Sequence, residues 1–571
     1  MKFIVNLYSE EMYFQNIREE MMLKPKLFTT LKTYTKELFF ADLSAGVIVG
    51  IVALPLAIAF AIASGVSPEK GVLTAIIAGF IISALGGSKV QIGGPTGAFV
   101  IIVFGIVQQY GLAGLTFATL LAGILLMIMG FAKMGTVIKF IPHPLIVGFT
   151  SGIAVIIFST QIKDFLGLSI ASVPSEFFDK WHAYFTNLHL INWYSLAIGG
   201  GSIALILLWQ KFNKKIPGSL VALLAATIAT YVFQLPVETI GTKFGEISVS
   251  LQMADFSQFT FAQAKQLIQP AVTIAILAAI EALLSAVVAD GMIGSRHRSN
   301  MELVAQGAAN IASSIFGGIP ATGAIARTAT NIKNGGKTPV AGIIHAVTLL
   351  LVMLFFGTYA SLIPLSALAA ILIIVSYNMS EWRSFVRVLK SPKSDVSVLL
   401  ITFFLTVVFD LTIAIEVGMV MSAFLFMHRM SMVTNVGVIT REFNEDEVED
   451  TQSINLKDVP KDVEVFEING PFFFGAVDKF REAIDRVAER PKVLIIRMRN
   501  VPAIDSTGIA VLEKLCLDNR KHGTHFVLSG VHSQPLIAIE QAGIIDVFGE
   551  ENIHDNIDSA LFRTREILGI N

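Results

Sequence analysis

Long apolar runs separated by short polar turns fill most of the chain up to residue 430. Each run has about the length that an α-helix needs to cross, or nearly cross, a lipid bilayer. The pattern therefore predicts a polytopic α-helical membrane protein. The runs lie at residues 43–64, 69–86, 112–131, 143–159, 193–210, 217–234, 271–290, 302–316, 338–356, 361–377, 394–409 and 411–428.

Two shorter apolar segments follow Gly/Pro breaks that look like copies of each other. Residues 93–98 read Gly-Gly-Pro-Thr-Gly-Ala, and residues 317–324 read Gly-Gly-Ile-Pro-Ala-Thr-Gly-Ala. With these segments the count reaches about fourteen, and a division at the connection 235–269 gives two sets of seven in which the broken segment is third. An odd number makes the two sets enter the membrane in opposite orientations, so we predict a 7+7 inverted repeat.

A different pattern begins after residue 430. Residues 431–461 are acidic and show no apolar periodicity, which is typical of a linker. We expect a small α/β domain beyond it, with strands at 463–468, 493–498 and 524–529 and helices at 477–489, 506–522, 535–542 and 556–568. The expected parts are an N-terminal segment 1–38, a membrane domain 39–430, the linker 431–461 and the α/β domain 462–571.

The charged residues predict how the chain is oriented in the membrane. The chain is 54% hydrophobic and 15% charged, against about a quarter charged in soluble proteins, and its formal net charge of -2 gives no sign of nucleic-acid binding. Residues 160–190 and 235–269, the predicted outer loops, mix bases with acids, whereas every second turn is basic. The basic turns and both termini are therefore expected in the cytoplasm of an inner-membrane protein. The bases are Lys89, Lys133, Lys211, Lys214, Lys215, Arg296, Arg298, Lys333, Lys337, Arg383, Arg387, Lys390, Lys393 and Arg429.

The paired breaks are candidates for an anion site. A helix that begins inside the bilayer leaves its first N–H groups without partners, and an anion both accepts from them and meets the positive end of the helix dipole. We expect Thr96 and Thr322 to cap these helices, and Gly97 and Gly323 to let a ligand approach the backbone. Arg327 adds a cation about one turn into the second helix. The alternative is a pair of ordinary helix breaks with glycines for packing.

A carboxylate in an apolar run is costly and usually functional. Glu281 lies in the run 271–290 and shares a helix face with Ser285, so it is a candidate for coupling to H⁺ or Na⁺. The alternative is a structural ion pair between Glu281 and Arg327 without a coupling role. Pro55, followed by Leu56, interrupts the first run and either lines a cavity or only kinks the helix.

No enzyme constellation is present in the sequence. There is no Ser/His/Asp arrangement, no Cys/His spacing for a metal, and no phosphate- or dinucleotide-binding glycine pattern. The single Cys516 excludes a disulfide within the chain. We therefore expect neither catalysis nor a metal site, and no cofactor other than a coupling Na⁺ or H⁺.

At these motifs the chain resembles the SulP family of anion transporters, which carry a C-terminal STAS domain. The resemblance begins near Phe39, and its most specific string runs from 302–307 to 317–328. Residues 71–75, 86–89, 93–99 and 288–292 are also similar to family signatures. One departure is Leu56, where many members have Gln; this leaves only backbone contacts from the first helix.

The resemblance implies a core domain and a gate domain, with substrate held between the third and tenth helices beside the first and eighth. The implied substrate-binding residues are Thr96, Gly97, Ala98, Phe99, Thr322, Gly323, Ala324, Arg327, Pro55 and Leu56. Residues 504–508 resemble the loop that is phosphorylated in anti-sigma-factor antagonists, which makes Thr507 a candidate regulatory site. The alternative is that Asp505 or Ser506 only caps the following helix.

The implied function is secondary active transport of a small anion such as sulfate, bicarbonate or a C4-dicarboxylate. Coupling to H⁺ or Na⁺, elevator-type alternating access, a homodimer and a regulatory partner of the STAS domain are further implications. The competing hypotheses are a passive anion channel or uniporter, a nucleobase-type permease on the same fold, and a signalling protein whose membrane part only senses anions.

Overall fold

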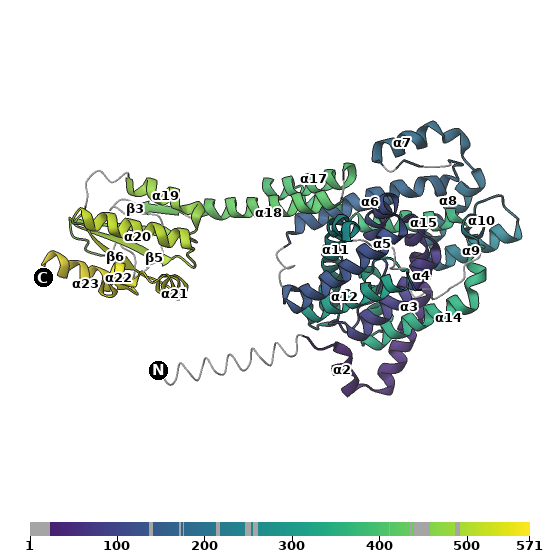
Figure 1. The fold of residues 1–571 in the computed structure, drawn as a ribbon, viewed down its shortest axis with the longest axis horizontal. Coiled ribbons are helices and arrows are strands. Elements are labelled where there is room, and N and C mark those ends of the chain that lie inside the picture. Colours follow the sequence, from purple (N-terminus) through teal and green to yellow (C-terminus); the bar gives the residue numbers. More distant parts are fainter. Residues whose placement is uncertain are drawn as a thin grey trace. The chain divides into compact units, whose positions relative to one another are not determined.

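The chain divides into two units, Met1–Met419 and Val420–Asn571. The first is almost wholly helical where it is described, and the second combines a sheet with helices (Figure 1). The computed structural model describes residues 23–570 except 136–140, 171–172, 175, 213–216, 246–252, 255–260, 410, 434, 439–456 and 486–490. Most of the expected N-terminal segment 1–38 and of the acidic linker therefore lies outside the described residues, as does the end of the helix expected at 477–489.

A helix covers every apolar run that the sequence predicted. Eight of the described helices are long and apolar enough to cross a membrane, which confirms a polytopic helical membrane unit, while the total of about fourteen spans stays a prediction. The helices of these runs are α3 (Lys36–Ala63), α4 (Pro68–Leu85), α5 (Phe99–Phe131), α6 (His143–Leu166), α8 (Trp193–Phe212), α9 (Gly218–Val232), α11 (Phe261–Ile293), α12 (Ser299–Ile315), α14 (Pro339–Ala360), α15 (Leu365–Met379), α17 (Lys393–Val408) and α18 (Leu411–Val433).

Shorter helices occupy the turns between these runs. Two of them follow the expected plan: the second short segment is α13 (Ile325–Lys333), and the first is the beginning of α5, which Gly111, at φ 70°, divides into two helices. Sequence reasoning missed α2 (Lys26–Thr30), α7 (Phe177–Thr186), α10 (Ile240–Phe244) and α16 (Trp382–Val388). These helices are too short to show a clear apolar period.

The helices of the membrane unit pack in two groups. One, called the core group here, consists of α3, α4, α5, α11, α12, α13 and α14, which contact one another extensively. The other, called the gate group, consists of α6, α8, α9, α15, α16 and α17. Contacts between the groups are fewer and are made mainly by α3 with α6, α9 and α15 and by α5 with α6. Two bodies with a sparse boundary agree with the expected core and gate domains.

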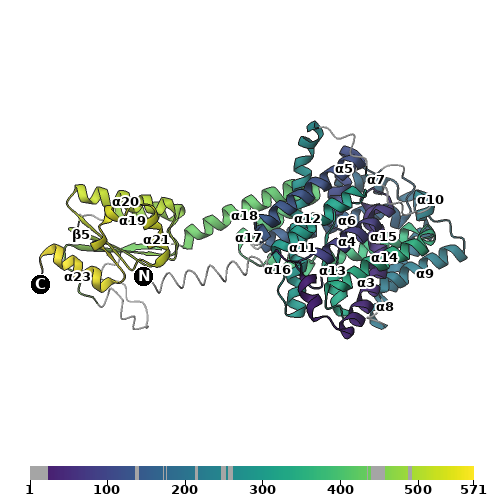
Figure 2. The ribbon, with the colours of Figure 1, turned by 60° about the horizontal axis from the view of Figure 1, so that its bottom comes forward.

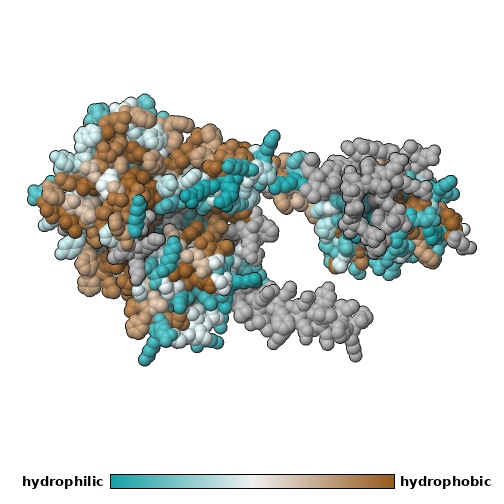
Figure 3. Space-filling view, turned by 180° about the vertical axis from the view of Figure 1, so that it is seen from behind, coloured by the Kyte–Doolittle hydropathy of each residue, from teal (hydrophilic) through white to brown (hydrophobic). Residues whose placement is uncertain are grey.

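The outer surface of the membrane unit is apolar. Figure 3 shows hydrophobic residues over much of it, and large side chains are exposed on several helices, among them Phe212 (84%), Phe233 (73%) and Phe355 (71%). Soluble proteins rarely expose contiguous apolar surface on this scale. Lipid contact is the physical explanation, so the chain is an integral membrane protein.

The second unit is built on a five-stranded sheet in the order β3-β4-β5-β6-β7. The strands are β3 (Asn435–Val438), β4 (Val463–Asn469), β5 (Val493–Asn500), β6 (His525–Ser529) and β7 (Ile553–His554); β3 is antiparallel to β4 and the others are parallel. The expected strands and helices are present. However, β3 lies within 431–461, so part of the expected linker belongs to the sheet.

Helices cover both faces of this sheet. One face packs against α19 (Phe474–Asp485), α20 (Ser506–Lys521), α21 (Ser533–Gln541) and α22 (Ile545–Phe548), and the other packs against α23 (Ile557–Leu568) (Figure 2). Alternate residues of β5 enter the two cores: Leu494 and Ile496 enter one, and Val493 and Ile495 enter the other. This alternation explains why β5 reads as an unbroken apolar run.

Candidate functional site

The two Gly/Pro breaks meet in the core group. Residues Gly93–Gly94 form β1 and Thr322–Gly323 form β2, and the two pair antiparallel, with Gly93 opposite Gly323. Helices α5 and α13 begin a few residues after these strands. The N-termini of both short helices therefore converge on one place, as the sequence predicted, and the antiparallel pairing fits two repeats of opposite orientation.

Buried polar side chains hold the irregular backbone of the second break. Asn310 of α12 donates from Nδ2 to the carbonyl of Ala321 (2.8 Å), and its Oδ1 accepts from the same residue's N–H (2.9 Å). Thr74 of α4 accepts from the N–H of Ile319 (2.7 Å), whose carbonyl accepts from Ser313 (2.8 Å). Non-helical backbone at membrane depth needs such partners. Sequence reasoning missed these supports because isolated Asn, Ser and Thr residues in apolar runs are not distinctive.

Neither threonine caps a helix, which corrects our expectation. The N-cap positions are Ala98 for α5 and Ala324 for α13, and neither start has a side-chain cap. Thr96 instead donates its hydroxyl proton to Oε2 of Glu281 (2.8 Å), and Thr322 donates to the carbonyl of Ala278 (2.8 Å). Both threonines therefore tie the breaks to α11. The first N–H groups of α5 are satisfied by backbone instead, because Phe99 and Val100 donate to the carbonyls of Thr96 (3.2 Å) and Gly97 (3.1 Å).

Arg327 joins the two breaks. Its side chain is 2% exposed, and Nη2 donates to the carbonyl of Pro95 in the first break. Nη1 is buried and has no partner in the described part of the chain, and a Cβ on Gly94 would lie only 2.4 Å from it. No ion pair between Arg327 and Glu281 is formed among the described residues, so the direct pair that was the alternative interpretation is absent. A buried donor without a partner is costly, and an anion's oxygen would satisfy it.

Glu281 and Ser285 have different surroundings. Glu281 is half-buried and accepts from Thr96, whereas Ser285 is fully buried and donates to Oγ1 of Thr328 on α13 (3.2 Å). That threonine also accepts from the N–H of Ile92, just before β1. Ser285 therefore supports the strand pair, and only Glu281 keeps part of its surface open.

The first helix runs through its proline without interruption. Pro55 is buried inside α3, so the expectation of an interrupted helix is wrong, although the helix loses one backbone hydrogen bond there. Leu56 is half-buried and packs against the large apolar cluster of the membrane unit, to which helices of both groups contribute. A Cβ on Gly97 would meet Met379 of α15 at 2.9 Å and Ile157 of α6 at 3.2 Å. The first break therefore lies directly against the gate group.

The remaining predicted substrate residues are buried. Ala98 and Phe99 are buried at the start of α5, and Ala324 is buried at the start of α13. The next residue, Ile325, is 40% exposed. Gly323 could not carry a side chain, since a Cβ there would lie 1.9 Å from Nε2 of Gln91. These residues come together around the strand pair, and their role in binding stays a prediction.

In the α/β unit, Thr507 is exposed in the first turn of α20. Asp505 caps this helix, because its carboxylate accepts from the N–H of Gly508 (2.8 Å) and also from that of Phe474 (3.1 Å). The capping alternative is therefore correct for Asp505. The hydroxyl of Thr507 is exposed, and its phosphorylation stays a prediction. Burial raises the pKa of the Cys516 thiol, which fits an inert packed residue.

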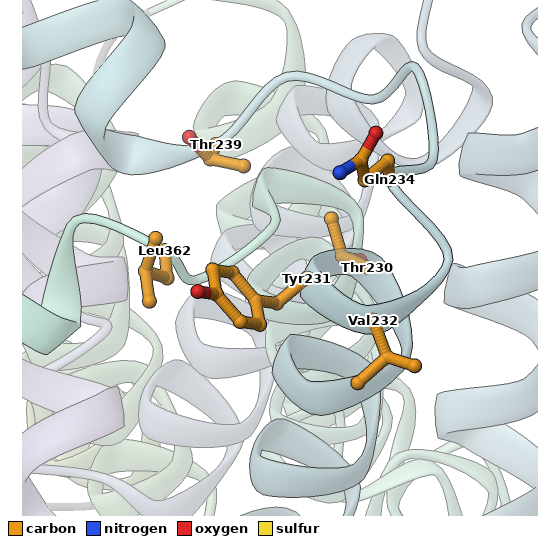
Figure 4. Close-up of a pocket in the computed structure, with 6 residues that line it drawn as sticks. All are labelled: Thr230, Tyr231, Val232, Gln234, Thr239 and Leu362. Atoms are coloured by element: carbon orange, nitrogen blue, oxygen red, sulfur yellow. The ribbon is translucent and has the colours of Figure 1, made fainter.

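Two cavities of the membrane unit lie away from the strand pair. Figure 4 shows the first, of about 460 Å³, where Thr230 and Tyr231 at the end of α9 face Thr239 and Leu362. The second, of about 440 Å³, lies between the first half of α5 and α7, α11 and α17. Neither is lined by a predicted substrate residue, so neither is the central site.

Comparison with known proteins adds two family matches. The model of the sulfate permease family matches residues 39–402, and the model of the STAS domain matches residues 456–560. The first match contains both breaks, Glu281 and Arg327, and the second contains β4 to β7.

Three relatives show how far this similarity extends. The putative sulfate transporter YvdB of Bacillus subtilis is 42% identical, over 92% of this chain and 98% of that protein. The bicarbonate transporter BicA of Picosynechococcus is 30% identical, over 83% of this chain and 85% of that protein. The solved structure of SLC26A9 shares the fold, with a TM-score of 0.85 at 20% identity, covering 98% of this chain and 96% of that chain. The relatives found by sequence are named as transporters and not as enzymes.

Proposed function

The chain belongs to the sulfate permease family and ends in a STAS domain, and from this premise we propose that it is a secondary active transporter of small anions. The substrates to test first are sulfate and bicarbonate, because relatives that match most of the chain are named for them. C4-dicarboxylates come second, since the dipole argument applies to any small anion. H⁺ or Na⁺ is the coupling ion.

The observation that carries this proposal is the pairing of β1 with β2. It brings two helix N-termini together, and Arg327 donates across the pair into the first break. The positive ends of two helix dipoles and a guanidinium together attract an anion and disfavour a cation. Glu281, bonded to Thr96 at the same place, supplies the negative charge that a coupling cation needs.

The two helix groups supply the moving parts. The substrate residues belong to the core group, while Met379 and Ile157 of the gate group lie against Gly97. We propose that the core group slides along the gate group and carries the anion across the membrane, as an elevator does. The positive-inside pattern orients the protein in the inner membrane with both termini in the cytoplasm. A homodimer and a regulatory partner of the STAS domain complete the proposal.

The decisive experiment is uptake by the purified full-length protein in proteoliposomes. Radiolabelled sulfate, bicarbonate and fumarate are offered while the Na⁺ and pH gradients are varied independently. Accumulation of one anion above its equilibrium level under an imposed gradient is the expected result. Purely downhill uptake would indicate a channel or uniporter instead, and competition by uracil would indicate a nucleobase permease.

Substituting Arg327 tests the site itself. We expect Arg327→Ala to abolish measurable uptake, because removing a buried charged partner costs about 2–5 kcal/mol. Arg383→Ala is the matched control, since Arg383 is exposed on α16 and its guanidinium lies over the ring of Trp382. Elution of both variants as single species in size-exclusion chromatography shows that they fold. Wild-type uptake by Arg327→Ala would contradict the site.

A further inference from the structure

The cavity between the two helix groups contains a buried cation that the central site does not use. The cavity has a volume of about 440 Å³ and is lined by the first half of α5, by α7, by the N-terminal part of α11 and by the end of α17. Lys180 of α7 lines it and is only 5% exposed. Within the described ranges, Lys180 makes no ion pair and its ammonium group donates no hydrogen bond.

Lys180 has lost most of its water without gaining a charged partner. Its Nζ lies 6.0 Å from the centre of the Phe104 ring, a weak attraction at that distance. Burial lowers the pKa of the Lys180 ammonium group because the charged form loses hydration. An anion in the cavity would restore the missing partner. Glu176 also lines the cavity but is exposed and forms no ion pair with Lys180.

The lysine is held by one helix group and faces the other. Trp181, the next residue, donates from Nε1 to Oγ of Ser159 on α6 (3.0 Å), which fixes α7 to the gate group. Phe104 and Gln269 on the opposite wall belong to α5 and α11 of the core group. A ligand in the cavity would therefore contact both bodies whose relative motion we propose.

The cavity follows the same helix that begins at the first break. Ile102 lines the cavity and lies three residues after the start of α5 at Phe99, about 4.5 Å along the helix axis. With Ile156 of α6 it gives the cavity an apolar inner end. Toward the other end, the amides of Gln109 and Gln269 supply hydrogen-bond donors. In the proposed topology, α7 lies on the outer side of the membrane.

We propose that Lys180 and this cavity form an outer anion subsite, where a small oxyanion is held before it reaches the central site. The inference rests on the proposed function for the direction of transport, but the binding event does not. Lys180 is suited to this role because a lysine presents a compact charge with three rotatable donors, without demanding one planar geometry. The apolar inner end separates the waiting anion from the strand pair.

Transport kinetics give the first test. We expect Lys180→Gln to raise the KM for external sulfate or bicarbonate about tenfold, as when one charge is lost from an access cleft, while kcat is unchanged. Lys180→Arg keeps the charge, so its KM should stay close to that of the wild type. Lys243→Gln is the matched control, because Lys243 pairs with Asp164 (3.4 Å) outside the cavity. An unchanged KM in Lys180→Gln would overturn the proposal, and so would an equal rise in Lys243→Gln.

A labelling experiment tests binding without requiring transport. Gly105 lines the cavity, and a Cβ added there would meet no atom within 4 Å, so Gly105→Cys is a probe that the fold tolerates. The only native cysteine, Cys516, is replaced by Ser. We expect a membrane-impermeant thiol reagent to label Cys at this position from outside, and sulfate or bicarbonate to slow the labelling.

The same labelling in the Lys180→Gln background decides the assignment. Loss of anion protection there supports the subsite. Equal protection in both backgrounds overturns it, and so does the absence of protection in both. Failure of the reagent to label the probe from outside overturns it as well. Failure of the proposed function would appear differently, as the absence of uptake by the wild-type protein with anion protection of the probe intact.

Discussion

Glu281 and Arg327 contact consecutive residues of the first break. Thr96 donates to the carboxylate of Glu281, and the carbonyl of Pro95 accepts from Arg327. The alternative interpretation of the sequence was that the two charges pair directly, because each needs a partner in an apolar surrounding. The break separates them instead, so an anion and a coupling cation bound there would each meet an opposite charge at a separate point. Opposite charges at neighbouring points make the binding of the two ions mutually favourable.

The substitution Glu281→Gln tests whether this residue couples anion uptake to H⁺ or Na⁺. The amide has the shape of the carboxyl and its Oε1 can still accept from Thr96, so the local fold should persist. The charge that attracts H⁺ or Na⁺ is lost. We expect gradient-driven uptake to fall by about 5- to 150-fold, which is the factor that typical coupling free energies between two sites correspond to. Uptake is measured in proteoliposomes with the pH and Na⁺ gradients imposed separately.

Glu416→Gln is the matched control for that substitution. Glu416 is exposed on α18 and lies outside the core group. It should retain the wild-type response to both gradients. If Glu281→Gln also responds to the gradients as the wild type does, then Glu281 has no coupling role, and its bond to Thr96 is structural.

Among the elements, the strand pair is the least tolerant of added volume. A Cβ on Gly323 would lie 1.9 Å from Nε2 of Gln91, and this nitrogen donates to the carbonyl of Ala282 (2.7 Å). On the other strand, Gly94 has a φ of 147°, a backbone angle that residues other than glycine rarely adopt. The strand pair therefore keeps its geometry only while positions 94 and 323 remain glycine.

Gly323→Ala should therefore disrupt the site. We expect a loss of about 1–3 kcal/mol from overpacking and a large loss of uptake, because Gln91 must leave Ala282 or β2 must leave β1. Gly201→Ala is the matched control: a Cβ there would meet nothing within 4 Å in α8. Thermal unfolding in detergent and uptake are compared; equal values for both variants would show that the strand pair tolerates a side chain.

The sequence predicted the long elements and the meeting of the breaks, but not the short elements or the partners. Apolar runs define the long helices between α3 and α18, because lipid requires about twenty apolar residues for each span. The duplicated breaks indicated that 93–98 and 317–324 are equivalent, and a repeat brings equivalent parts together. Capping by Thr96 and Thr322 was wrong because a hydroxyl serves equally well as a donor to α11, and only tertiary structure decides between the two. The buried Lys180 looked like an ordinary loop cation.

The whole molecule consists of two units with separate cores. The residues of the central site and the outer cavity all lie before residue 420, and the α/β unit has its own buried clusters on both faces of its sheet. The boundary between the two units affects which strands the sheet retains when the chain is shortened. The edge strand β3 comes directly after α18 and pairs with β4, so it belongs to the sheet although it lies far from the other strands in sequence.

Two truncations separate these roles. A chain ending at residue 433 keeps α18 and removes the whole sheet, and we expect it to retain anion uptake because no site residue is lost. A chain ending at residue 441 keeps β3 without β4, which leaves a row of unpaired backbone groups that can pair between molecules. We expect it to aggregate more readily, as measured by size-exclusion chromatography at increasing concentration. If the shorter chain folds but does not take up anions, the STAS domain takes part in transport itself; if both chains behave alike, β3 does not need the sheet.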